Sequence, residues 1–186
     1  IRNHLIGFDP SSNSPKDFTI GVYPLLVDET CWFLAADFDK DTWKEDVIAF
    51  LETCQAHNVP AVLERSRSGN GGHVWIFFSE PIPASLARRM GSYLLTRTME
   101  HRPEIGLDSY DRFFPNQDTM PKGGFGNLIA LPLQKKPRDS DNSVFVDENF
   151  EPYLDQWAFL STVHQLNRQE VEAIIDEASE PGGFLG

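Results

Sequence analysis

Residues 31–40 read CWFLAADFDK, an apolar run that ends in two acidic residues at alternate positions. Such a run, bounded by polar residues, is typical of a buried β-strand. Side chains at positions i and i+2 of a strand project from the same face, so Asp37 and Asp39 can reach one divalent cation together. Mg²⁺ and Mn²⁺ prefer such oxygen ligands. A solvated turn at a strand exit is the other interpretation of this pair.

A glycine-rich stretch, SGNGGH, follows at residues 68–73. Residues without a Cβ allow backbone N–H groups to converge on an anion, and a triphosphate is the natural occupant. The next residues, 74–78, form an apolar run that predicts a strand, so His73 is expected at the strand start, where it can donate a hydrogen bond to phosphate. A hairpin with a structural histidine is the alternative.

Arginine side chains beside this stretch favour an anion site, because guanidinium groups match phosphate oxygens. The sequence therefore predicts a nucleotide-binding set, and its members are Ser68, Gly71, Gly72, His73, Arg65 and Arg67.

A third segment, residues 107–136, reads LDSYDRFFPNQDTMPKGGFGNLIALPLQKK. Asp108 and Asp111 each follow a hydrophobic residue in it. Near its C-terminal end, residues 127–133 predict a strand. The basic residues that follow this strand are suited to contact template phosphates. The candidate template-binding residues are Lys122, Gln134, Lys135 and Lys136. The last three lie in this basic stretch together with Arg138, and a solvated loop is the alternative for these four residues.

The order of these three motifs resembles that of the archaeo-eukaryotic primase superfamily. The stretches FLAADFD, ERSRSGNGGHVWIFF and SYDRFFPNQDTMPKGGFGNLIALPLQ are similar to the primase-polymerase domain of the helicase-linked TOTE conflict systems, over roughly residues 1–165. The resemblance implies that Asp37 and Asp39 bind metal and that His73 contacts the triphosphate. The third metal ligand is then Asp111, after Tyr110, with Asp108 held in reserve.

The same resemblance implies an enzyme, a nucleotidyltransferase that uses two Mg²⁺ or Mn²⁺ ions to add ribo- or deoxyribonucleotides on a single-stranded DNA or RNA template. A tethered helicase is the implied partner. Three alternatives stay open: a catalytically inactive RRM-like binding module attached to a helicase, a DxD glycosyltransferase, and a haloacid-dehalogenase phosphatase beginning at DFDKDT. A calcium loop is excluded, because Thr42 replaces the required glycine and Ile48 the required terminal Glu.

Composition sets limits on this interpretation. A chain of 186 residues, 40% of them hydrophobic, can bury a real core. We expect a catalytic domain over residues 1–150 and a helical annex over residues 151–186 that leads to a linker. No apolar run approaches about 20 residues, which argues against a membrane span. Two cysteines, Cys31 and Cys54, and the lack of a signal peptide indicate a reducing, cytoplasmic location.

The formal net charge of −12 is unfavourable for binding nucleic acid, but the charge is unevenly spread. Residues 139–186 hold eleven acidic residues and one basic residue, a net −10, and residues 1–59 hold ten and four, a net −6. Residues 60–138 hold seven acidic and eleven basic residues, a net +4. The part that contains the second and third motifs is therefore the electropositive one.

The periodicity predicts an α+β fold. Helices are expected over residues 42–57, 83–100, 152–164 and 168–179, and further strands over 60–66 and 73–78. Irregular loop is expected within the third motif, and a polar connector over 137–143. The order strand, helix, two strands, helix, strand suggests an RRM-like antiparallel sheet with flanking helices, which is also the primase core. Trp75 and Phe77 then either stack on nucleobases or pack in the core.

Overall fold

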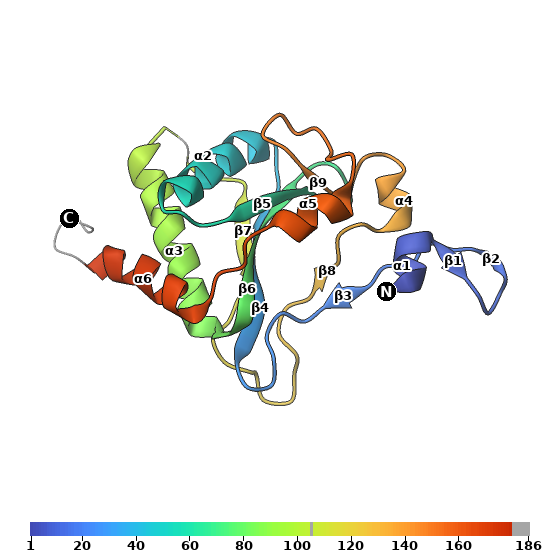
Figure 1. Ribbon diagram of the computed structural model, residues 1–186, viewed down its shortest axis with the longest axis horizontal. Helices are drawn as coiled ribbons and strands as arrows, with labels where there is room; N and C mark the ends of the chain where they lie inside the picture. Colours follow the sequence, from blue (N-terminus) through green and yellow to red (C-terminus); the bar gives the residue numbers. More distant parts are fainter. Residues whose placement is uncertain (105, 180–186) are drawn as a thin grey trace.

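The computed structural model describes residues 1–104 and 106–179, and its centre is a five-stranded antiparallel sheet (Figure 1). The strands of this sheet are β4 (Thr30–Phe38), β5 (Ala61–Arg65), β6 (Gly72–Pro83), β7 (Tyr110–Phe114) and β9 (Val144–Val146). Their order across the sheet is β7-β4-β6-β5-β9. The two longest strands, β4 and β6, therefore lie at its centre, where they are paired on both sides.

The chain connectivity is that of an RRM-like core. Helix α2 (Trp43–Ala56) joins β4 to β5, and helix α3 (Ala84–His101) joins β6 to β7. The resulting β-α-β-β-α-β order, with β4 and β6 in the middle, is the ferredoxin-like arrangement. The predicted α+β class with an antiparallel sheet and flanking helices is confirmed.

One face of the sheet carries the larger core. Helices α2, α3 and α6 (Arg168–Ser179) lie together on this side, as Figure 1 shows. Their apolar side chains recur at helical spacing, as with Met90 and Leu94 of α3, and pack on strand residues such as Leu34 and Ile76. Burial of this stripe, and not intrinsic propensity, is what holds such helices in place.

The opposite face carries a second, smaller core and the polar site described below. Helix α5 (Gln156–Thr162) packs here through Phe159, next to Trp75 and Phe145 of the sheet. Trp75 is only 2% exposed, so of its two interpretations core packing is the one observed. Phe77 is half-buried and lines an apolar cavity of about 360 Å³ together with Trp157.

Short elements complete the chain. Strands β3 (Gly21–Val22) and β8 (Ile129–Ala130) form one two-stranded ribbon, and β1 (Phe8–Asp9) and β2 (Ser14–Pro15) form another. Helices α1 (Arg2–Ile6) and α4 (Lys135–Arg138) contact each other beside them.

Two sequence-based expectations in the third motif are wrong. The expected loop contains strand β7, whose two charged residues at 111 and 112 interrupt the apolar alternation that marks a strand. The strand expected over residues 127–133 is reduced to β8, and Pro132 beyond it cannot donate a ladder hydrogen bond. The expected connector at 137–143 begins inside α4.

Residues 151–179 pack against the rest of the molecule. Leu160 of α5 and Val171 of α6 join the core clusters of the sheet. The boundary near residue 150 stays a prediction, and the linker expected at the end of the chain lies outside the described residues. Among those residues, no helix is both long enough and apolar enough to cross a membrane.

Candidate functional site

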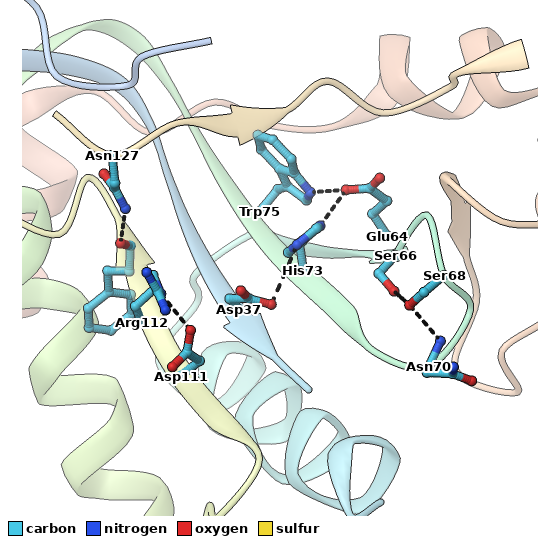
Figure 2. A network of polar contacts seen from close by, with 11 residues as sticks. Asp37, Glu64, Ser66, Ser68, Asn70, His73, Trp75, Asp111, Arg112 and Asn127 are labelled. Carbon is cyan, nitrogen blue, oxygen red and sulfur yellow. Dashed lines mark hydrogen bonds and ion pairs between the residues drawn. The ribbon is translucent and has the colours of Figure 1, made fainter. Parts of the chain in front are cut away.

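A row of charged and polar side chains crosses four strands of the sheet. Glu64 of β5 pairs with His73 of β6, His73 pairs with Asp37 of β4, and Asp37 pairs with Arg112 of β7. Directly paired residues of antiparallel strands project from the same face. The row therefore lies on the face opposite α2 and α3, as Figure 2 shows.

His73 lies between two carboxylates. Its Nδ1 is 3.0 Å from Oε2 of Glu64, and its Nε2 is 3.5 Å from Oδ1 of Asp37. Burial lowers the pKa of His73, but the hydrogen bond to Glu64 and the charges of Glu64 and Asp37 outweigh it, so the net shift raises the pKa. The imidazole is therefore favoured in its cationic form, which suits contact with a phosphate.

The charges of Asp39 and Asp111 act on Asp37. Burial raises the pKa of Asp37, and the charges of Asp111 and Asp39 raise it further against the opposing effect of His73 and Arg112. Asp39 directly follows β4, where its backbone N–H donates to the carbonyl of Ser109 at 2.8 Å. The end of β4 and the start of β7 thus bring negative charge together on the side of the sheet opposite α2 and α3.

Asp111 reaches this face through a β-bulge in β7. The register pairs Asp37 with Arg112 but Phe38 with Tyr110, so Asp111 is an extra residue without a partner in β4. Tyr110 packs edge-on against Phe38 on the helix-covered side. The bulge re-aims a side chain, as bulges beside functional sites commonly do.

Asp108, the reserve candidate, lies elsewhere. Its carboxylate is next to Gly106, where an added Cβ would be 3.2 Å from Oδ1, and its backbone carbonyl accepts a hydrogen bond from Lys40 at 2.8 Å. Asp111, in contrast, is near enough to Asp37 for its charge to raise the pKa of that carboxyl. Of the two candidates, Asp111 is the better placed beside Asp37.

The donor chemistry fits a hard divalent cation. Asp37, Asp39 and Asp111 offer carboxylate oxygens, and a cation would relieve the repulsion that raises the pKa of Asp37. Within residues 1–104 and 106–179, no three His, Cys, Asp or Glu side chains are close enough to hold an ion by themselves. Asp111 accepts a hydrogen bond from Nε of Arg112 at 2.5 Å. Substrate phosphates and water would therefore complete the ligand set, as is usual for Mg²⁺.

Helix α2 anchors the segment that leads into β7. Asp46 is 2% exposed and accepts hydrogen bonds from the Ser109 backbone N–H at 3.0 Å and the Ser109 hydroxyl at 2.5 Å. Thr42 donates to the same oxygen at 3.2 Å. The contact fixes the chain just before the bulge, and a one-dimensional pattern gave no sign of it because Asp46 and Ser109 are far apart in the sequence.

The glycine-rich stretch forms the hairpin between β5 and β6. The N–H groups of Ser66, Gly69 and Asn70 are already bonded within it. Its glycines meet packing demands: a Cβ on Gly71 would lie 2.6 Å from the Phe38 carbonyl, and one on Gly72 would lie 2.8 Å from the Trp43 ring. The stretch is therefore a hairpin whose glycines are required by packing, and Gly71 brings the turn against Asp39; its contact with a nucleotide stays a prediction.

The arginines beside the hairpin differ in availability. Arg65 donates to the backbone carbonyls of Asp141 and Phe150, so it holds a neighbouring loop in place. Arg67 is exposed. Ser68 lies at the exposed tip, 3.1 Å from the hydroxyl of Ser66 (Figure 2). Of this group Arg67 and Ser68 are accessible to a ligand, whereas Arg65 is engaged in structure.

The candidate template-binding residues are not gathered at one point. Lys122 lies exposed in the connection between β7 and β8, whereas Lys135 and Lys136 belong to α4, where Lys135 pairs with Asp139. Gln134 is 0% exposed and its amide group donates to Asp17 and Thr19. The expected template contact of Gln134 is therefore wrong, because its side chain is enclosed by the chain.

Sequence reasoning missed two members of the row. Glu64 follows Leu63 in a strand and looks like a solvent-facing residue, yet it is 1% exposed. Arg112 follows Asp111 directly, and no local pattern marks it as part of the row. The alternation in β5 and β6 places Glu64 on one face with Val62, but the register that aligns it with His73 is a property of the sheet.

The comparison with known protein families agrees with this arrangement. No curated protein matches the chain. Residues 1–174 match the family described as the archaeo-eukaryotic primase domain of TOTE conflict systems. The expected resemblance is therefore confirmed over a slightly longer range than residues 1–165. Since the match includes all three motifs and nearly every residue, this chain belongs to the archaeo-eukaryotic primase family of TOTE conflict systems.

Proposed function

We propose that this primase-family domain catalyses template-directed nucleotidyl transfer on single-stranded nucleic acid, as primer synthesis or extension. The observation that carries the proposal is that Asp37 lies beside His73, 3.5 Å from its Nε2, and near enough to Asp39 and Asp111 for their charges to act on it. Family membership supports this reaction over the glycosyltransferase and phosphatase alternatives.

The chain's own residues would bind and orient the reactants. Asp37, Asp39 and Asp111 would hold two Mg²⁺ or Mn²⁺ ions, which when bound activate the attacking 3′-hydroxyl and neutralise the leaving pyrophosphate. His73 would contact the triphosphate of an incoming ribo- or deoxyribonucleotide. The guanidinium of Arg112, half exposed at 51%, is placed to compensate phosphate charge once it leaves Asp111.

Template-dependent incorporation of labelled nucleotide tests the proposal directly. We expect product with a single-stranded template, nucleotide and Mg²⁺ or Mn²⁺. We expect none above background when EDTA removes the metal, because the carboxylates alone cannot activate the 3′-hydroxyl or neutralise the pyrophosphate. Reactions without template are the control. Nucleotide or template binding without any incorporation under these conditions would instead identify an inactive binding module.

We also expect weak template binding that depends shallowly on salt. A chain of net charge −12 should make few basic contacts with the template, so the slope of log affinity against log salt should correspond to about two to four phosphates. Replacing Lys122 or Lys136 with alanine should each lower that slope by about one. Fluorescence anisotropy with a labelled oligonucleotide over a salt series measures it.

The matched control is Arg89→Ala, because Arg89 is exposed on α3, which covers the opposite face of the sheet.

A helicase tethered to the domain would raise the local template concentration and make weak contacts sufficient. Tight binding with a steep salt slope, unaffected by the two lysine variants, would contradict this account of the template contacts.

A further inference from the structure

Glu64 is a carboxylate in an unusual place. It lies within strand β5 and is 1% exposed, and burial of a charged group costs free energy unless hydrogen bonds compensate it. Two donors from β6 do so: His73 through Nδ1 at 3.0 Å and Trp75 through Nε1 at 2.9 Å, both to Oε2 (Figure 2). Packing alone does not require a carboxylate here.

The contact determines how the imidazole is presented. A carboxylate accepts hydrogen bonds, so Nδ1 of His73 must carry the proton in this bond. The opposite ring nitrogen, Nε2, is then the one that faces Asp37, at 3.5 Å. Trp75 can only donate, so its bond to the same oxygen helps to compensate the buried charge of Glu64 without reaching the imidazole.

We propose that Glu64 is a positioning residue for His73: it fixes the ring orientation and the proton on Nδ1, so that Nε2 is directed at the nucleotide phosphates beside Asp37. The inference rests on the proposed function for the identity of the ligand, whereas the orientation itself stands on the contacts. Carboxylates that bind the far nitrogen of a functional histidine act in this way at metal sites and in catalytic triads.

Glu64→Gln tests the role, because it keeps the size and one acceptor oxygen and removes the charge. We expect the KM for nucleotide to rise roughly 10-fold, with kcat changed less than about 2-fold, the lower end of the effect of losing a histidine's supporting carboxylate. The ¹⁵N shifts of the His73 ring, assigned with a His73 variant, should show Nδ1 protonated in the wild type and a changed proton distribution in Glu64→Gln.

Trp75→Phe is the matched control, since it removes the other donor to Glu64 and leaves the bond to His73. The ring shifts of His73 should then remain as in the wild type, and KM should change less than about 3-fold. An equal rise of KM in both variants would overturn the proposal and indicate a general packing effect. Unprotonated Nδ1 in the wild type would overturn it without any variant.

The two hypotheses fail differently. If His73→Ala leaves nucleotide use unchanged, the proposed phosphate contact is wrong, but the ring shifts in Glu64→Gln still decide whether Glu64 orients the imidazole. If the shifts of His73 are the same in Glu64→Gln and the wild type, the positioning role is wrong whatever the activity shows.

Discussion

Asp37→Asn should abolish template-directed incorporation, with a fall in kcat of at least about 10³-fold, because metal ligation stabilises the transition state by several kcal/mol. The substitution keeps the shape of the side chain. Burial raises the pKa of Asp37, which means that the charged form is less favourable in the folded chain than in the unfolded one. The free energy of unfolding of Asp37→Asn should therefore equal or exceed that of the wild type.

The measurement pairs steady-state incorporation with thermal unfolding. A variant with unchanged or raised Tm and no activity would separate the chemical role of Asp37 from a structural one, a common trade-off at sites of crowded charge. Normal incorporation by Asp37→Asn would refute the three-carboxylate site.

Two further variants identify the third ligand. Asp111→Asn should lose activity to a similar degree. Asp111 lies in the bulge beside Asp37, and the charge of Asp111 raises the pKa of Asp37. Asp108→Asn is the matched control and should retain activity within about 3-fold, since its side chain lies against Gly106 and surface substitutions away from a site have small effects. The reverse pattern would make Asp108 the ligand.

His73→Ala should raise the KM for nucleotide roughly 10- to 100-fold and leave template affinity nearly unchanged. The reason is the loss of a charge-assisted hydrogen bond to phosphate, which contributes about 1.5–3 kcal/mol. The net upward shift of the His73 pKa keeps the imidazole cationic, and so suited to this contact, to higher pH than an ordinary histidine.

Nucleotide titrations at fixed template, and anisotropy with labelled template, measure the two effects separately. His57→Ala is the matched control: His57 ends α2 and contacts Glu177, on the helix-covered side of the molecule. Equal use of nucleotide by His73→Ala and the wild type would leave His73 with a structural role only. Equal losses of nucleotide and template affinity would indicate a general disturbance of the sheet.

Several features could be predicted from the sequence, because they depend on neighbouring residues. Strand alternation predicted one face for Asp37 and Asp39, of which Asp37 lies in β4 and Asp39 directly follows it. The apolar run after the glycines predicted His73 at a strand start, where β6 has it. Helices α2 and α3 followed from their 3.6-residue periodicity, and α6 was predicted over the residues it occupies. Together these local patterns sufficed for the fold class and for two of the three motifs.

Other features were decided only by the tertiary structure. The register between β5 and β6 pairs Glu64 with His73. The bulge in β7 places Asp111 beside Asp37. Gln134 is buried, and its amide group donates to Asp17 and Thr19. The hairpin glycines likewise depend on close contacts with Phe38 and Trp43. Each depends on partners distant in the chain, and pairing between distant strands is set by global packing, which no local periodicity encodes.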